Sequence, residues 1–233
     1  RQGQRLTTMT SGQARFPIAP SKYRFAQKGQ CGMWMNDELL PHLGRSADDI
    51  CWMRSLHTEA INHDPGITFL CTGSQQVGHP SLGAWLSYGL GSENRDLPAF
   101  VVLVSQGTGK NPGQPIFARL WGSGFLPSEH QGVQLRSGKS PVLHLENPPG
   151  VDRALHRPQL DALRDLNALR AAETGDPETT ARIAQYELAY RMQASVPELA
   201  DLRDEPEETF RLYGEDARVP GSYAANCLLA RRL

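Results

Sequence analysis

The stretch Pro98-Ala-Phe-Val-Val-Leu-Val104 decides the fold class of this chain. It is a continuous, β-branched apolar run bounded by turn residues, which is typical of a buried parallel strand. Two helices are expected before it, from Pro65 to Thr72 and from Leu82 to Leu90, each followed by a glycine. A shorter apolar run from Ile50 to Met53 predicts another buried strand. The order strand, helix, helix, strand indicates an α/β protein.

The remaining segments differ in composition, and we expect them to surround one domain spanning residues 1–233. Residues 1–30 are polar and without periodicity, which predicts an extended arm. Residues 105–141 are rich in glycine and proline and predict a long loop region, a length that is usually functional. A short strand is expected from Val142 to Leu145. Residues 150–220 are dominated by helical patterns and predict an insertion packed on the α/β core.

Composition excludes several classes of protein. The chain has 233 residues, of which 39% are hydrophobic and 21% charged, as in a soluble globular protein. The net charge is −1, so the basic excess of a nucleic-acid-binding protein is missing, and we expect no nucleic-acid partner. The apolar runs are far shorter than a membrane span requires. The chain opens without methionine and stops just after a helical run, so we expect a fragment of a longer protein, cut on both sides.

The densest polar cluster lies between the expected strand at 50–53 and the helix that follows it. It contains His57, Glu59, Asn62 and His63, together with Asp64. Ligands of open α/β sheets bind at the carboxyl ends of the strands, and a helix N-terminus attracts anions. Histidine and carboxylate side chains can also hold a metal or transfer protons. The plainer alternative is that the Asn and Asp residues only cap the helix and the histidines are loop residues.

One further polar group lies in the glycine-rich region. Ser128-Glu129-His130 belongs to the long loop region, and we expect it to close over the polar cluster. His130 is therefore a candidate substrate-binding residue, against the alternative of a solvated turn.

A resemblance to known proteins is carried by several stretches spread over nearly the whole chain. They are Arg24-Phe-Ala-Gln-Lys-Gly-Gln-Cys-Gly-Met-Trp34, Glu38-Leu-Leu-Pro-His42, Arg54-Ser-Leu-His-Thr-Glu-Ala-Ile-Asn-His-Asp-Pro65, Thr72-Gly73-Ser74, Gly83-Ala-Trp-Leu-Ser-Tyr-Gly-Leu-Gly-Ser-Glu93, Leu120-Trp-Gly-Ser-Gly-Phe-Leu-Pro127, Ala184-Gln-Tyr-Glu187 and Tyr223-Ala-Ala-Asn-Cys-Leu-Leu-Ala230. Together these stretches resemble a large family of exported bacterial proteins. That family is catalogued as a domain of unknown function (number fifteen hundred and one) and is often labelled sulfatase, within the alkaline phosphatase-like superfamily.

The resemblance implies a fold and places the reacting groups. It implies a partial, doubly wound, mostly parallel sheet of the alkaline phosphatase or sulfatase type, with a helical C-terminal half. The sulfatase motif C-x-P-S-R-x-x-x-x-T-G, aligned by Thr72-Gly73, puts His63 at the nucleophile position and Pro65 at the proline. Formylglycine cannot form there, because the position is not cysteine. The sulfatase G-K-W-H stretch falls near Ser105, which makes that residue a candidate for substrate binding.

The function expected from this resemblance is a metal-dependent hydrolase of sulfate or phosphate esters, acting on a small molecule or a carbohydrate. Its catalytic residues would be His63, Asn62 and Asp64. A divalent metal, namely zinc, calcium or manganese, would bind His57, Glu59 and His63. The alternative is a non-catalytic protein of the same fold that binds anionic glycans. The resemblance also implies an exported, periplasmic protein.

Overall fold

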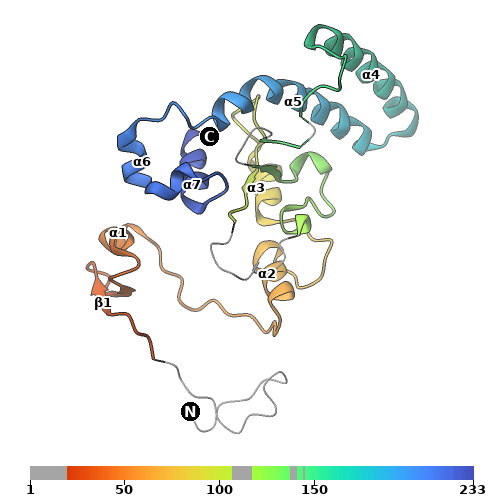
Figure 1. Cartoon of the computed structure of the whole chain (residues 1–233). Helices are drawn as coiled ribbons and strands as arrows, with labels where there is room; N and C mark the ends of the chain where they lie inside the picture. The colour runs from red at the N-terminus through yellow and green to blue at the C-terminus, as the bar shows by residue number, and fades with distance from the viewer. Residues whose placement is uncertain (1–19, 107–116, 137–140, 144) are drawn as a thin grey trace. The chain divides into compact units, whose positions relative to one another are not determined.

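The computed structural model describes residues 20–106, 117–136, 141–143 and 145–233. The chain divides into two units, the first ending at Ile61 and the second running from Asn62 to Leu233 (Figure 1). The described residues combine seven α-helices with four short strands, in one antiparallel and one parallel pair, so the fold is α/β, as predicted. None of the described helices has both the length and the apolar character needed to cross a membrane.

The first unit is built around a β-hairpin. Strand β1 (Phe25–Lys28) pairs antiparallel with β2 (Met33–Asn36), and helix α1 (Pro41–Arg45) and the 3₁₀ turn η2 (Ala47–Asp49) follow. The described end of the expected arm therefore contains a strand, and residues 1–19 lie outside the described part.

The side chain of Asp48, in η2, stabilises the turn of the β-hairpin. The Asp48 carboxylate accepts hydrogen bonds from the backbone N–H groups of Gln30 and Cys31, both at 2.8 Å. These donors stabilise the charged form and lower the pKa of Asp48. Gly29 lies at φ +63° directly against this carboxylate, so the turn needs a residue without a side chain there.

The strand expected from Ile50 to Met53 does not form. Ile50 is the residue after η2, and residues 51–53 have no regular structure. The Trp52 indole N–H donates to the carbonyl of Ala47 at 2.8 Å, which turns the segment back onto η2. The apolar run is explained by this local packing, and no strand among the described residues pairs with it.

In the second unit, two helices lead to a parallel strand pair. These elements are α2 (His63–Thr72), α3 (Leu82–Leu90) and β3 (Val101–Leu103), followed by β4 (Val133–Leu135). Strands β3 and β4 are parallel, with Val101 opposite Val133. Both helices end at the predicted glycines, with Gly73 in the left-handed region at φ +75°.

The glycine-rich region contains more structure than expected. Besides β4 it contains two 3₁₀ turns, η3 (Ala118–Trp121) and η4 (Ser128–His130), while residues 107–116 and 137–140 lie outside the described part. The strand expected from Val142 to Leu145 is wrong at residues 142 and 143, which form a bend and a turn. Val142 and Leu145 instead pack with β4 in a hydrophobic cluster.

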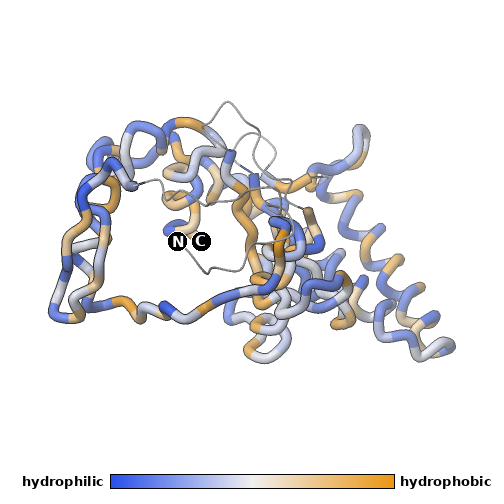
Figure 2. Tube along the Cα trace, turned by 90° about the horizontal axis from the view of Figure 1, so that it is seen from below, coloured by the Kyte–Doolittle hydropathy of each residue, from blue (hydrophilic) through white to orange (hydrophobic). Residues whose placement is uncertain are grey.

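The C-terminal half is helical, as predicted. Helices α4 (Arg153–Thr174) and α5 (Pro177–Ala200) form an antiparallel hairpin that extends to one side (Figure 1). Figure 2 shows hydrophilic and hydrophobic residues alternating along this hairpin. Arg157 of α4 links the two helices of the hairpin, because it donates two hydrogen bonds to the carboxylate of Glu187 on α5, at 2.6 and 3.0 Å. Helix α5 also contributes Met192 and Val196 to the cluster around the strands.

A smaller helical group follows α5. It contains α6 (Glu207–Tyr213), the 3₁₀ turn η5 (Glu215–Arg218) and α7 (Tyr223–Arg232). Phe210, Ala217 and Leu228 form its own buried cluster. The segment between α5 and α6 is fixed to α7 by Glu205, which is almost fully buried and ion-paired with two arginines of α7. The second unit therefore has two hydrophobic cores linked by α5.

Candidate functional site

The N-terminus of α2 presents the central residues of the predicted cluster. Asn62 is the N-cap residue, but its side chain forms no capping hydrogen bond, so the capping alternative fails for Asn62. His63 and Asp64 begin the helix, and all of these side chains are exposed. The third helical residue is Pro65, which has no N–H, so the open amides of this terminus belong to His63 and Asp64.

A guanidinium group lies at this helix terminus. Arg119 of η3 forms an ion pair and a hydrogen bond with the carboxylate of Asp64. The guanidinium also lies 4.2 Å from the ring centroid of Phe117, which holds it in a cation–π contact. Its Nε–H is buried and has no hydrogen-bond partner among the described residues. Asp64 therefore anchors a cation beside His63 rather than capping its own helix.

The residues predicted as metal ligands are divided between the two units. His57 and Glu59 are exposed and belong to the first unit, in the segment without regular structure after η2. His63 belongs to the second unit. Within the described ranges, no three His, Cys, Asp or Glu side chains are arranged so that they could hold a metal ion.

Ser105 contacts α7. The Asn226 side-chain amide, buried on α7, donates to the Ser105 hydroxyl at 3.0 Å. The neighbouring Gln106 backbone N–H donates to the carbonyl of Gly221 at 2.8 Å. These contacts fix the chain after β3 to the C-terminal helical group, which is a structural role for Ser105.

His130 packs on helix α3. Its Nδ1 atom lies 3.1 Å from the hydroxyl of Ser87, and its ring makes an edge contact with Tyr88 at a centroid distance of 5.4 Å. The Glu129 carboxylate lies 3.8 Å from His130 Nε2. Next to it, Ser128 hydrogen-bonds to Glu178 of α5, so η4 joins α3 to the helical hairpin.

Sequence reasoning missed Arg119. No local pattern marks it, because it lies 55 positions from Asp64 and outside the polar cluster. The only indication in the sequence is that it lies directly before Leu120-Trp-Gly-Ser-Gly-Phe-Leu-Pro127, a stretch that carries the family resemblance.

The arrangement at α2 suits an anionic group. Open backbone N–H groups at a helix N-terminus and a nearby guanidinium are the donors that bind sulfate, phosphate and carboxylate in proteins. His63, the first residue of this helix, adds an exposed imidazole to the same terminus. The pairing of Arg119 with Asp64 orients the guanidinium but also offsets its charge, so an anion must share Arg119 with Asp64.

The fold and this site define an α/β protein with a histidine and an Asp64–Arg119 ion pair at an open helix terminus. Over residues 1–233 the chain matches the family described as "Protein of unknown function (DUF1501)", and it belongs to that family, as the resemblance predicted. Comparison with curated proteins and with solved structures gave no match.

Proposed function

We propose that the chain is part of a hydrolase of sulfate or phosphate esters, on a fold of the alkaline phosphatase and sulfatase type. The observation that carries the proposal is the contact between Arg119 and Asp64, because it puts a guanidinium beside His63 at an open helix terminus. The parallel pairing of β3 and β4 is compatible with such a sheet. Export to the periplasm is part of the same proposal and rests on the resemblance alone.

Each residue of the site has a distinct role in this proposal. Arg119 and the amides of His63 and Asp64 bind the non-bridging oxygens of the ester. The His63 imidazole attacks the sulfur or phosphorus centre and displaces the alcohol part of the ester, and water then cleaves the N–S or N–P bond to release the anion and restore the imidazole. Alternatively, His63 takes a proton from a water molecule that attacks this centre and displaces the same alcohol group. Asp64 positions Arg119, and the side-chain amide of Asn62 adds an uncharged hydrogen-bond donor beside the anion.

A divalent metal was expected from the resemblance, with His57, Glu59 and His63 as ligands. The described residues do not fit such a site, since no group of metal-binding side chains forms among them. We therefore assign no step to a metal. Zinc, calcium and manganese belong in the assays as added components.

The test is hydrolysis of nitrophenyl sulfate and nitrophenyl phosphate, with and without each metal. His63→Ala should lower turnover by roughly 10²–10⁴-fold, the usual loss for a group that takes part in the reaction. Arg119→Met should mainly raise KM, because it removes binding to the anion. The matched controls are His42→Ala and Arg182→Met, two exposed residues elsewhere in the chain.

The outcomes separate the roles of these residues. Asn62→Ala should change turnover little compared with His63→Ala, since a neutral donor contributes less than a reacting group. Full activity in His63→Ala, with normal folding by circular dichroism, would end the catalytic role of this histidine.

The second candidate function is a non-catalytic binding protein for anionic glycans. It is favoured by the same donor set, which binds an anion without any metal, and by histidine at the position where a sulfatase has its cysteine. This candidate predicts no turnover with any metal. It also predicts binding of a sulfated glycan such as heparin, and that Arg119→Met but not Arg182→Met weakens this binding.

A further inference from the structure

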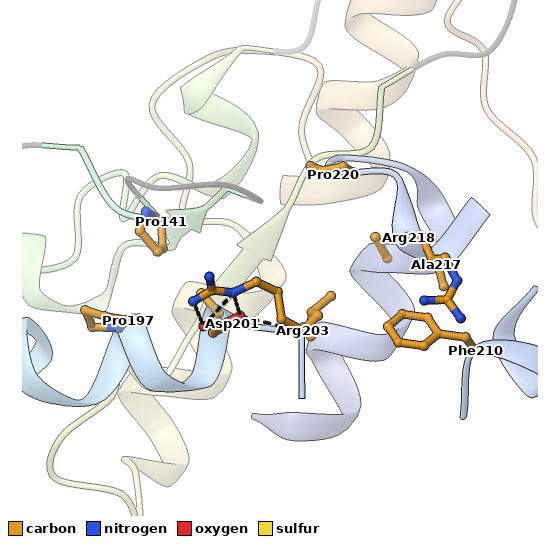
Figure 3. A pocket seen from close by; sticks show the side chains of 11 residues that line it. Pro141, Pro197, Asp201, Arg203, Phe210, Ala217, Arg218 and Pro220 are labelled. Carbon is orange, nitrogen blue, oxygen red and sulfur yellow. Dashed lines mark hydrogen bonds and ion pairs between the residues drawn. The ribbon is translucent and has the colours of Figure 1, made fainter. Parts of the chain in front are cut away.

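A second site lies in a pocket between the two hydrophobic cores of the second unit. The pocket has a volume of about 780 Å³ and is bounded by the end of α5, by α6 and η5, and by the first turn of α7 (Figure 3). This volume lies within the range of pockets that bind small molecules, and such pockets often form between packed substructures.

The walls of this pocket are apolar and contain short or rigid side chains. Pro141 and Pro197 lie on one side in Figure 3, while Phe210 and Ala217 lie on the opposite side and Pro220 lies above. Prolines have fixed φ angles and alanine is short, so these walls cannot rearrange easily to fill the space. The pocket therefore offers rigid apolar walls, one of them the flat ring of Phe210, to an apolar body.

Two guanidinium groups and one carboxylate supply the charge of the lining. Arg203 is paired with Asp201, with its Nε atom 2.8 and 3.1 Å from the two carboxylate oxygens. This pairing lowers the pKa of Asp201, so the carboxylate stays ionised and offsets Arg203. Arg218 is the remaining charge of the lining, and it lies 3.9 Å from the ring centroid of Phe210.

Arg218 can exchange partners at low cost. Its present partners are Glu207 and Glu215, whose side chains are 74% and 82% exposed. Ion pairs this exposed contribute little to stability, because water screens them. An anionic group that enters the pocket can replace these rim carboxylates on Arg218, while the contact between Arg218 and Phe210 persists.

We propose that this pocket binds a small molecule with a flat apolar body and one anionic group, such as an aryl carboxylate or aryl sulfonate. The apolar body lies between the proline wall and Phe210, and the anionic group binds Arg218 and the free edge of Arg203. The site uses none of the residues at the N-terminus of α2, so it is independent of the proposed ester hydrolysis.

The probe is the anilinonaphthalene sulfonate dye, whose fluorescence rises in apolar pockets, titrated into the full chain. Arg218→Met should weaken its binding about tenfold, the effect of losing one charge-assisted contact. Glu207→Gln should tighten binding, because it removes a competitor for Arg218. Arg211→Met is the matched control, since Arg211 is an exposed residue of α6 outside the pocket lining, and it should change nothing.

Two further arms identify the place of binding. Ala200→Trp should block the pocket and abolish the fluorescence rise, and phenylnaphthylamine, the neutral parent of the dye, should bind about tenfold more weakly than the sulfonate. Circular dichroism of each variant verifies that it is folded. Dye binding that Arg218→Met, Glu207→Gln and Ala200→Trp all leave unchanged, or equal binding of the neutral parent, would overturn the proposal.

Discussion

Helix α3 contains two glycines whose replacement by alanine should have opposite effects on stability. At an ordinary helix position, alanine is more stable than glycine by about 0.5–1 kcal/mol, because it restricts the unfolded chain. A Cβ atom at Gly89 would meet no atom within 4 Å, so Gly89→Ala should show this gain. A Cβ atom at Gly83 would lie 2.4–2.5 Å from the ring of Phe100, well inside contact distance.

The clash at Gly83 should outweigh the helix gain. The ring of Phe100 is partly buried, just before β3, and it must move if α3 is to keep its packing against η3 and η4. Overpacking of this kind costs about 1–3 kcal/mol. After the gain from helix propensity is subtracted, we expect Gly83→Ala to lower the free energy of unfolding by about 1 kcal/mol.

The assay is urea denaturation followed by far-ultraviolet circular dichroism, with the denaturant dependence compared between variants. The double variant Gly83→Ala/Phe100→Leu should recover part of the loss, because the smaller side chain makes room for the new methyl group. The reasoning is refuted if Gly83→Ala stabilises the chain as much as Gly89→Ala does, or if the Phe100 change brings no recovery.

Two other predictions follow from the two units. Leu228→Ala should lower the free energy of unfolding by about 2–5 kcal/mol, because Leu228 is fully buried in a cluster with Phe210 and Ala217. Leu212→Ala, on the exposed face of α6, is the control and should change this free energy little, with both values measured by urea denaturation. Asp48→Asn should speed hydrogen exchange at the amides of Gln30 and Cys31. Because folding lowers the pKa of Asp48, the stabilisation that its carboxylate gives to the hairpin turn is present above about pH 4 and is lost as the pH falls through the folded pKa. Exchange rates of these two amides that are the same in Asp48→Asn and in the unchanged chain above about pH 4 would contradict this prediction.

Local signals in the sequence located helices α2 and α3 and the helical character of the C-terminal half. Gly73 and Gly91 terminate α2 and α3, and Asp176 caps α5 by accepting a hydrogen bond from Glu178 N–H at 3.0 Å. Capping and glycine termination depend only on neighbouring residues, so a single sequence reveals them. Strand predictions were less successful, because a short apolar run becomes a strand only when a partner lies beside it. Ile50–Met53 has no such partner among the described residues, whereas Val101–Leu103 has β4.

For the candidate site, too, the sequence revealed neighbouring residues but not partners that are distant along the chain. The sequence located Asn62, His63 and Asp64 at a helix terminus, since all of them lie within one local pattern. It could not assign Asp64 its partner, because Arg119 reaches it from a 3₁₀ turn far along the chain. That partner changes what Asp64 does, from a capping carboxylate to the anchor of a guanidinium. The difference decides what the site can bind, because a helix terminus with a bare acid repels an anion, whereas one with an anchored arginine can hold it.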